Sequence, residues 1–171
     1  MKMPAYLRLA GFISTAAAAV LLGTPGATWA QQPRTPITWT AVSPASSVAA
    51  GATLKAELTV KIDEGWHLYS LTQNPPPDPT RIVVADGQPF TLGGKIEAPA
   101  PETGFDQAQG SDTEFYTDRV AFKVPLTVAK GTAPGKHVAK IKATWQACSG
   151  TLCLRPQTST LDVTVQVTAS K

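Results

Sequence analysis

The chain has 171 residues, with 15 Lys and Arg, 12 Asp and Glu, and two cysteines. Two of the basic residues, Lys2 and Arg8, lie in the first ten positions, so the remainder of the chain is nearly neutral. This balance excludes nucleic-acid or membrane-surface binding that depends on a basic patch.

Residues 1–30 are predicted to be a cleaved secretory signal peptide. A positive start precedes an apolar run over residues 9–23, and the small residues Thr28 and Ala30 precede the expected cut before Gln31. The run is too short and too rich in Ala for a membrane span, and no later segment is apolar enough to be one. Residues 31–171 are then expected to form a single exported domain, in an oxidising compartment where a disulfide persists.

Four segments alternate apolar and polar residues with the period of a half-buried strand. They cover residues 53–62, 119–129, 136–147 and 159–168, and shorter strands are expected at 37–43 and 80–84. Turn-prone residues separate these segments, and no window of ten residues has a helical pattern. The pattern predicts an all-β, immunoglobulin-like antiparallel β-sandwich, with one long loop over residues 99–112.

The two cysteines, Cys148 and Cys153, follow the third alternating segment. Continuing its alternation puts Cys148 on the outer, polar face, and a four-residue connection allows Cys153 to lie opposite it across a hairpin. A disulfide there closes a short loop and stabilises the fold by only about 2 kcal/mol. The spacing alone leaves two interpretations open, a structural staple and a reactive pair.

A third interpretation is a metal site made of both cysteines with His67 and His137. His137 lies eleven residues before Cys148, which is roughly 30 Å or more along a strand at about 3.3 Å per residue. We therefore expect no metal site, and the sequence indicates no cofactor.

Four stretches together resemble the amino-terminal periplasmic domain of the DsbD family of thiol:disulfide interchange proteins. They are "DEGWHLYS" (63–70), "NPPPDPT" (74–80), "TEFYTDRVAFKVPLTV" (113–128) and "WQACSGTLCLRPQTSTLDVTV" (145–165). The resemblance extends over about residues 50–167. It implies an immunoglobulin-like sandwich in the periplasm that carries electrons from a thioredoxin-like or membrane thiol-reductase donor to periplasmic thiol-disulfide proteins.

The resemblance also assigns roles to individual residues. It implies that Cys148 and Cys153 are the redox pair, with Cys153 as the exchanging sulfur and Cys148 as the resolving one. It places His67 and Tyr69 beside the pair, and it implies a cap over residues 104–112 that shields the sulfurs, with Phe105 as its aromatic residue.

The sequence departs from the family pattern at three points. Four residues separate the cysteines instead of five, and "LRPQ" follows the second cysteine where the family has "LPP". The full-length proteins continue into a membrane conduit and a thioredoxin-like domain, whereas this sequence ends at Lys171, so we expect a separate electron donor. The alternative to a thiol-disulfide exchange function is a secreted interaction module with an inert disulfide. Whether the chain is an enzyme stays open.

Overall fold

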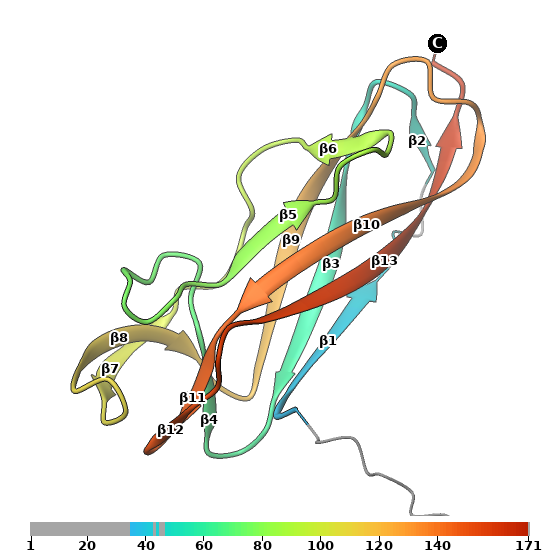
Figure 1. Cartoon of the computed structure of the whole chain (residues 1–171). Helices are drawn as coiled ribbons and strands as arrows, with labels where there is room; N and C mark the ends of the chain where they lie inside the picture. The colour runs from blue at the N-terminus through green and yellow to red at the C-terminus, as the bar shows by residue number, and fades with distance from the viewer. Residues whose placement is uncertain (1–34, 43, 45–46, 171) are drawn as a thin grey trace, which may run out of the picture. The chain divides into compact units, whose positions relative to one another are not determined.

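The computed structural model describes residues 35–42, 44 and 47–170, and all its regular elements are β-strands (Figure 1). In this part of the chain no helix has the length and apolar character of a membrane span. The predicted signal peptide, residues 1–30, lies outside the described residues.

The first sheet has four antiparallel strands in the order β1-β3-β9-β6. They are β1 (Ile37–Val42), β3 (Thr53–Ile62), β9 (Arg119–Val128) and β6 (Phe90–Leu92). The predicted alternation of β3 is confirmed, because Ala56, Leu58, Val60 and Ile62 are buried. Each buried side chain of this kind stabilises the fold by roughly 1.5–3 kcal/mol.

The second sheet has the order β2-β13-β10-β5. It contains β2 (Val48–Ala49), β13 (Gln157–Thr168), β10 (Gly135–Trp145) and β5 (Arg81–Val84). Strand β2 pairs in parallel with β13, and the other two pairings are antiparallel. The two four-stranded sheets face each other (Figure 1), and their inner side chains form one hydrophobic core. This is the immunoglobulin-like sandwich that the alternation predicted.

A third sheet of five strands, in the order β12-β11-β4-β8-β7, lies at one end of the sandwich (Figure 1). It contains β4 (Trp66–Tyr69), β7 (Glu102–Asp106), β8 (Ser111–Tyr116), β11 (Ala147–Ser149) and β12 (Leu152–Cys153). All of its pairings are antiparallel. Both cysteines belong to this sheet.

The strand predicted over residues 136–147 is in fact divided between two sheets. Strand β10 ends at Trp145, and β11 begins at Ala147 in the third sheet. Gln146 lies between them, and its side chain accepts a hydrogen bond from the Asp78 N–H at 2.9 Å and donates one to the Leu154 carbonyl at 3.1 Å. These side-chain bonds hold the chain where it passes from one sheet to the other.

The prediction of one long loop over residues 99–112 is wrong for most of that segment. Residues 102–106 of β7 pair with residues 111–115 of β8 in a hairpin. Most side chains of β7 are exposed or half-buried, so this strand carries no hydrophobic alternation that sequence analysis could detect. Gly110 closes the turn with a positive φ of 69°, a conformation that favours glycine.

Candidate functional site

The cysteines face each other across a tight hairpin and form a disulfide. Cys148 in β11 pairs with Cys153 in β12, and their Cα atoms are 4.1 Å apart. Ser149 pairs with Leu152, which leaves only two residues in the turn instead of the four expected. The predicted hairpin is confirmed, and its connection is shorter than predicted.

Cys148 is fully buried, although the alternation predicted a position on the outer, polar face, where a side chain is normally accessible. Its neighbour Ala147 belongs to the hydrophobic core, whereas Cys148 pairs with His67 of β4 and lies outside that core. Its side chain thus points away from the core, but its exposed fraction is 0% because other residues cover it. Cys153 is partly exposed.

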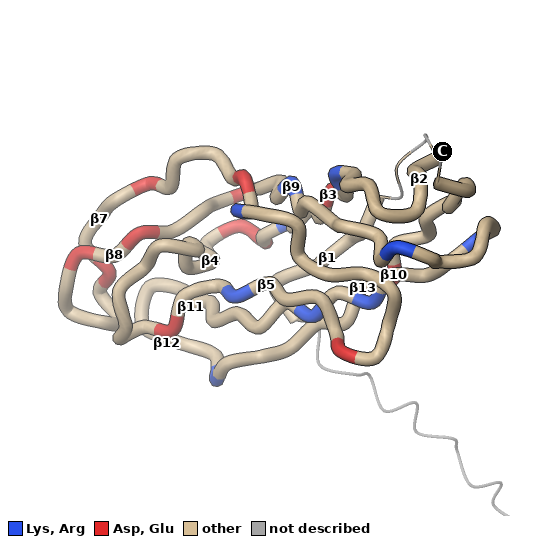
Figure 2. The backbone as a smooth tube through the Cα atoms, turned by 90° about the horizontal axis from the view of Figure 1, so that it is seen from above, with Lys and Arg blue, Asp and Glu red and all other residues tan. Residues whose placement is uncertain are grey.

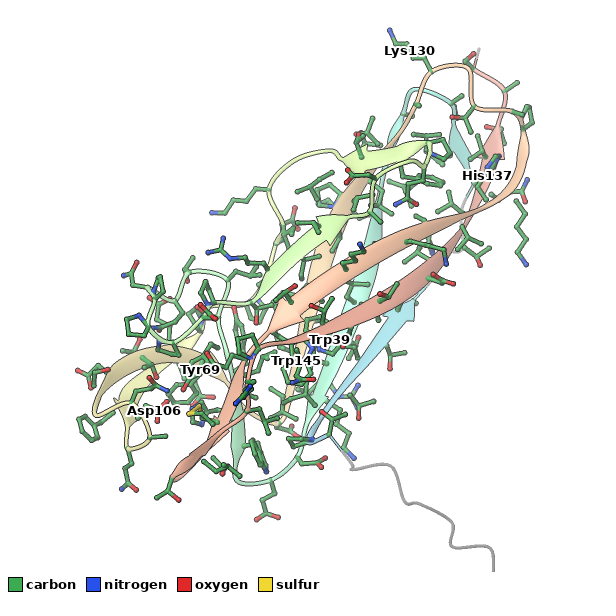
Figure 3. All side chains as sticks on the ribbon, viewed as in Figure 1. Trp39, Tyr69, Asp106, Lys130, His137 and Trp145 are labelled. Atoms are coloured by element: carbon green, nitrogen blue, oxygen red, sulfur yellow. A yellow bond between two sulfur atoms is a disulfide. The ribbon has the colours of Figure 1, made fainter. Side chains whose placement is uncertain are left out.

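A small polar cluster covers the sulfur of Cys148 (Figure 3). The Tyr69 hydroxyl donates to Asp106 Oδ2 at 2.5 Å and also lies 2.8 Å from Cys148 Sγ. His67 Nε2 lies 2.9 Å from the same Asp106 oxygen. Tyr69 and Asp106 are buried, and His67 is mostly so, with 15% of its side chain exposed. A phenol, a carboxylate and an imidazole therefore meet beside the disulfide.

The turn after β7 fixes the position of Asp106 and adds a further contact to the sulfurs. Asp106 Oδ1 accepts hydrogen bonds from the backbone N–H groups of Ala108 at 2.9 Å and Gln109 at 3.3 Å. An aspartate that bonds its own turn in this way is common in tight turns. The Gln109 side-chain amide lies 3.2 Å from Cys153 Sγ and 3.8 Å from Cys148 Sγ. The β7–β8 hairpin thus covers the disulfide with polar groups.

The electrostatics of the cluster keep its phenol neutral and its carboxylate charged. Burial, reinforced by the neighbouring Asp106, raises the pKa of Tyr69 well above its ordinary value. Burial alone would raise the pKa of Asp106, but the hydrogen bonds from Tyr69 and His67 outweigh it and hold the pKa below its usual value. Tyr69 therefore stays a hydrogen-bond donor, and Asp106 stays an acceptor, at neutral pH.

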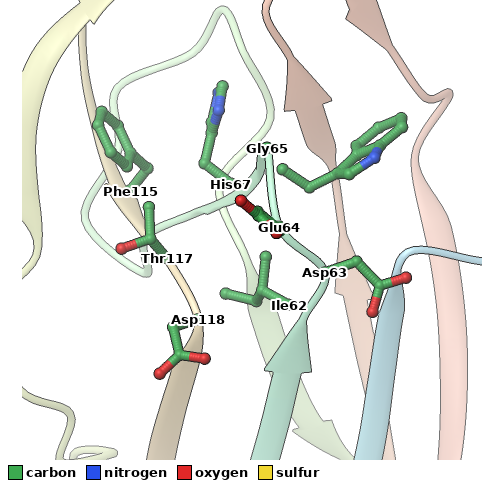
Figure 4. Close-up of a pocket in the computed structure, with 9 residues that line it drawn as sticks. Ile62, Asp63, Glu64, Gly65, His67, Phe115, Thr117 and Asp118 are labelled. Carbon is green, nitrogen blue, oxygen red and sulfur yellow. The ribbon is translucent and has the colours of Figure 1, made fainter.

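A pocket of about 600 Å³ adjoins the cluster and shares His67 with it (Figure 4). It is lined by the turn before β4 and by the end of β8 with the residues that follow. The carboxylates of Asp63, Glu64 and Asp118 line it together with the aromatic ring of Phe115. The ring centroids of His67 and Phe115 are 4.9 Å apart. The pocket is thus acidic, and His67 connects it to the cluster beside the disulfide, although neither cysteine lines it.

The structure brings some of the predicted residues together and separates others. His67 and Tyr69 lie beside Cys148 as described above. Phe105 lies on β7 of the covering hairpin, but 67% of it is exposed. His137 lies at the far end of β10, where its Nε2 contacts the Ala133 carbonyl oxygen at 2.8 Å (Figure 3).

Two residues of the site, Asp106 and Gln109, were not identified from the sequence. The segment "DQAQG" (106–110) carries a turn signal, an aspartate followed by a glycine, which could have predicted the hairpin turn. The family resemblance placed a cap over the sulfurs in this segment, but it did not single out these two side chains. Apart from the resemblance, no signal in the sequence indicates that this turn reaches the cysteines, which lie about forty residues further along.

Comparison with protein families gives one clear match. A family model described as "Thiol:disulfide interchange protein DsbD, N-terminal" matches residues 38–165. No curated protein matches the chain at the level of sequence.

Two solved structures that resemble the chain are the N-terminal domain of a DsbD protein and the N-terminal periplasmic domain of a ScsB protein. The N-terminal domain of DsbD from Neisseria meningitidis, in its reduced form, is 18% identical, with 68% of this chain and 82% of that chain covered and a TM-score of 0.48. The N-terminal periplasmic domain of ScsB from Proteus mirabilis is 16% identical, with 80% of this chain and 49% of that chain covered and a TM-score of 0.56. The chain therefore spans about half the length of the ScsB domain, and that likeness shows the fold alone.

Proposed function

This chain belongs to the family of DsbD N-terminal domains, and we propose that it exchanges thiols and disulfides with periplasmic partners through Cys148 and Cys153. The observation that carries the proposal is a disulfide whose two sulfurs differ in exposure, with a buried polar cluster beside it. A pure staple needs no such cluster, since a buried carboxylate and a buried phenol are costly unless they are well bonded.

The difference in exposure supports Cys153 as the exchanging sulfur. A partner thiolate attacks Cys153 Sγ, the sulfur–sulfur bond breaks, and Cys148 leaves with the bonding electron pair. The Tyr69 hydroxyl, 2.8 Å from Cys148 Sγ, is placed to donate a hydrogen bond to the leaving thiolate. A second partner thiol then attacks the mixed disulfide, so that the partner becomes oxidised and this chain gains two electrons and two protons.

The partners proposed are a thioredoxin-like or membrane thiol-reductase donor and periplasmic thiol-disulfide proteins as acceptors. Phe105 and Leu152 support a docking role for this end, because both are large apolar side chains that are more than half exposed. Leu152 directly precedes Cys153 in β12, so it is exposed on the same hairpin as the exchanging sulfur. Transfer to the acceptor is the reverse of the exchange with the donor.

Trapping the mixed disulfide tests the proposal. The Cys148→Ser variant, with Cys153 activated as a mixed disulfide with thionitrobenzoate, should form a lasting adduct with a reduced thioredoxin variant that keeps only its first active-site cysteine. The thioredoxin thiolate attacks Cys153 Sγ and thionitrobenzoate leaves, and neither protein then has a second cysteine to resolve the adduct. The matched Cys153→Ser variant should form much less adduct, because its remaining sulfur is buried. Non-reducing electrophoresis and mass spectrometry measure both adducts.

The reduction potential of the wild-type disulfide separates this function from the alternative of an inert interaction module. Structural disulfides have potentials below about −300 mV, and exchanging ones are more oxidising. A potential well below that limit, with no adduct in either variant, would reject the exchange function and favour the interaction module.

A further inference from the structure

We propose that the site, once its disulfide is reduced, binds one zinc ion through Cys148, Cys153, His67 and Asp106. In the oxidised structure His67, Asp106 and Cys148 already converge, with one potential ligand atom of each lying within 4.8 Å of the other two. Cys153 Sγ is bonded to Cys148 Sγ, so it belongs to the same cluster. Reduction adds two thiol groups to an imidazole and a carboxylate that are already in place.

The spacing of these groups suits a tetrahedral ion. Zinc binds sulfur at about 2.3 Å and nitrogen or oxygen at about 2.0–2.2 Å, so neighbouring ligand atoms lie about 3.3–3.8 Å apart. His67 Nε2 and Asp106 Oδ2 are 2.9 Å apart and need to separate by only a few tenths of an ångström. The opposed positions of Cys148 and Cys153 across β11 and β12 hold their sulfurs together after the bond between them is broken.

The donor set selects the kind of metal. Two thiolates with one imidazole and one carboxylate favour zinc over calcium or magnesium, which prefer a shell of oxygen atoms. The backbone N–H groups of Ala108 and Gln109 already orient the Asp106 carboxylate through its other oxygen. The Tyr69 hydroxyl can remain bonded to Asp106 or to Cys148 as an outer contact, and such contacts usually strengthen a metal site.

The four groups can bind zinc only in the reduced protein. In the disulfide neither sulfur carries the negative charge that a zinc ligand needs. A dithiol donor supplies two electrons and two protons, which convert the disulfide to two thiols while the donor becomes a disulfide. Zinc binding then releases the two thiol protons to solvent. The inference rests on the proposed function only in requiring that the disulfide can be reduced.

Zinc affinity of the whole exported chain tests the site. The protein is reduced with a phosphine, desalted without oxygen, and titrated with zinc against a chromophoric chelator. One zinc ion per chain should bind to the reduced protein, and binding to the oxidised protein should be at least a hundredfold weaker. The absorption spectrum of the reduced wild type with cobalt(II) should show tetrahedral bands together with thiolate-to-cobalt charge transfer.

Variants separate a four-ligand site from two thiols that bind metal by themselves. His67→Gln and Asp106→Asn should each weaken zinc binding at least about tenfold, as losses around zinc sites usually do. The matched controls His137→Gln and Asp162→Asn, which change residues that take no part in the cluster, should leave it unchanged. Equal affinity of the reduced and oxidised proteins, or unchanged affinity in both site variants, would overturn the proposal. If Asp106→Asn does not fold, His67→Gln and the wild-type cobalt spectrum still decide the question.

Adduct formation by Cys148→Ser is measured without zinc, so the exchange function and zinc binding can fail independently.

Discussion

At the scale of single residues, Asp106 is a buried carboxylate that depends on its hydrogen-bond donors to stay charged. Its side chain is only 1% exposed, and it accepts hydrogen bonds from Tyr69, from its own turn and, in the matching tautomer, from His67. Its pKa is lowered in the folded protein because these donors favour the charged carboxylate. The folded state therefore binds a proton at this position less readily than the unfolded state does.

This difference predicts a pH-dependent contribution to stability. Because the folded pKa lies below the unfolded value of about 3.9, the contribution is present above about pH 5 and is lost as the pH falls through the folded pKa. Asp106→Asn should lower the free energy of unfolding of the oxidised protein by about 1–3 kcal/mol at pH 7, since the buried donors lose a charged acceptor. Urea unfolding should show that the difference in free energy of unfolding between the variant and the wild type becomes smaller as the pH falls from neutral to acidic.

In the control Asp162→Asn, which changes an exposed residue, this difference should be small at every pH. A gap for Asp106→Asn that is the same at every pH would contradict the assigned pKa direction.

At the scale of elements, the β7–β8 hairpin decides how accessible the disulfide is. It contributes Asp106 at the end of β7 and Gln109 in the turn, and the Gln109 amide contacts both sulfurs. These contacts hold the turn over Cys153, the more exposed of the two sulfurs. The hairpin is thus placed to slow the attack of small thiols on the disulfide.

Removing the Gln109 amide should speed the reduction of the disulfide. We expect Gln109→Ala to be reduced by dithiothreitol about fivefold faster than the wild type, which is the effect of losing a hydrogen bond of about 1 kcal/mol. Gln107→Ala is a matched control, because Gln107 lies in the same turn but is exposed. Stopped-flow measurement of the rate on the oxidised proteins compares the three. Equal rates for the two variants would show that the turn does not protect the sulfurs.

At the scale of the whole molecule, most of the acidic residues lie at one end of the sandwich. Three segments, residues 63–80, 99–118 and 145–154, contain eight of the twelve acidic residues and no Lys or Arg. Figure 2 shows these acidic positions around β4, β7 and β8, with most basic positions along the two larger sheets. Both cysteines lie in the acidic part of the chain. A partner with a basic surface around its own cysteines should be attracted to this end.

Small charged disulfides measure this attraction directly. The reduced protein should react with cationic cystamine more slowly as salt rises from about 0.01 M to about 1 M, because the Debye length falls from about 30 Å to about 3 Å. Its reaction with anionic dithiodiglycolate should become faster over the same range. The double variant Glu64→Gln, Asp118→Asn should show weaker salt effects than the control pair Asp86→Asn, Asp162→Asn. Salt effects that have the same sign for both reagents would contradict the electrostatic interpretation.

The sequence by itself determined the sandwich, because strand alternation is a local signal. Strand β3 has the predicted bounds, and β9, β10 and β13 begin or end within two residues of their predicted limits. The motif "GWHLY" placed His67 and Tyr69 beside the cysteines through its resemblance to the family. The five-position offset between the two cysteines predicted the hairpin that joins them. Each of these inferences depends on neighbours in the chain.

Only the tertiary structure decided how Cys148 is covered. Alternation correctly turned its side chain away from the core, but exposure depends on what lies over that face. Tyr69 lies 79 positions from Cys148 in the sequence, and Gln109 lies 39 positions from it. The hairpin that supplies Asp106 and Gln109 has mostly exposed side chains in β7 and gives no hydrophobic pattern. Contacts between segments so far apart are fixed by sheet pairing and packing, and for this reason the buried polar cluster became visible only in three dimensions.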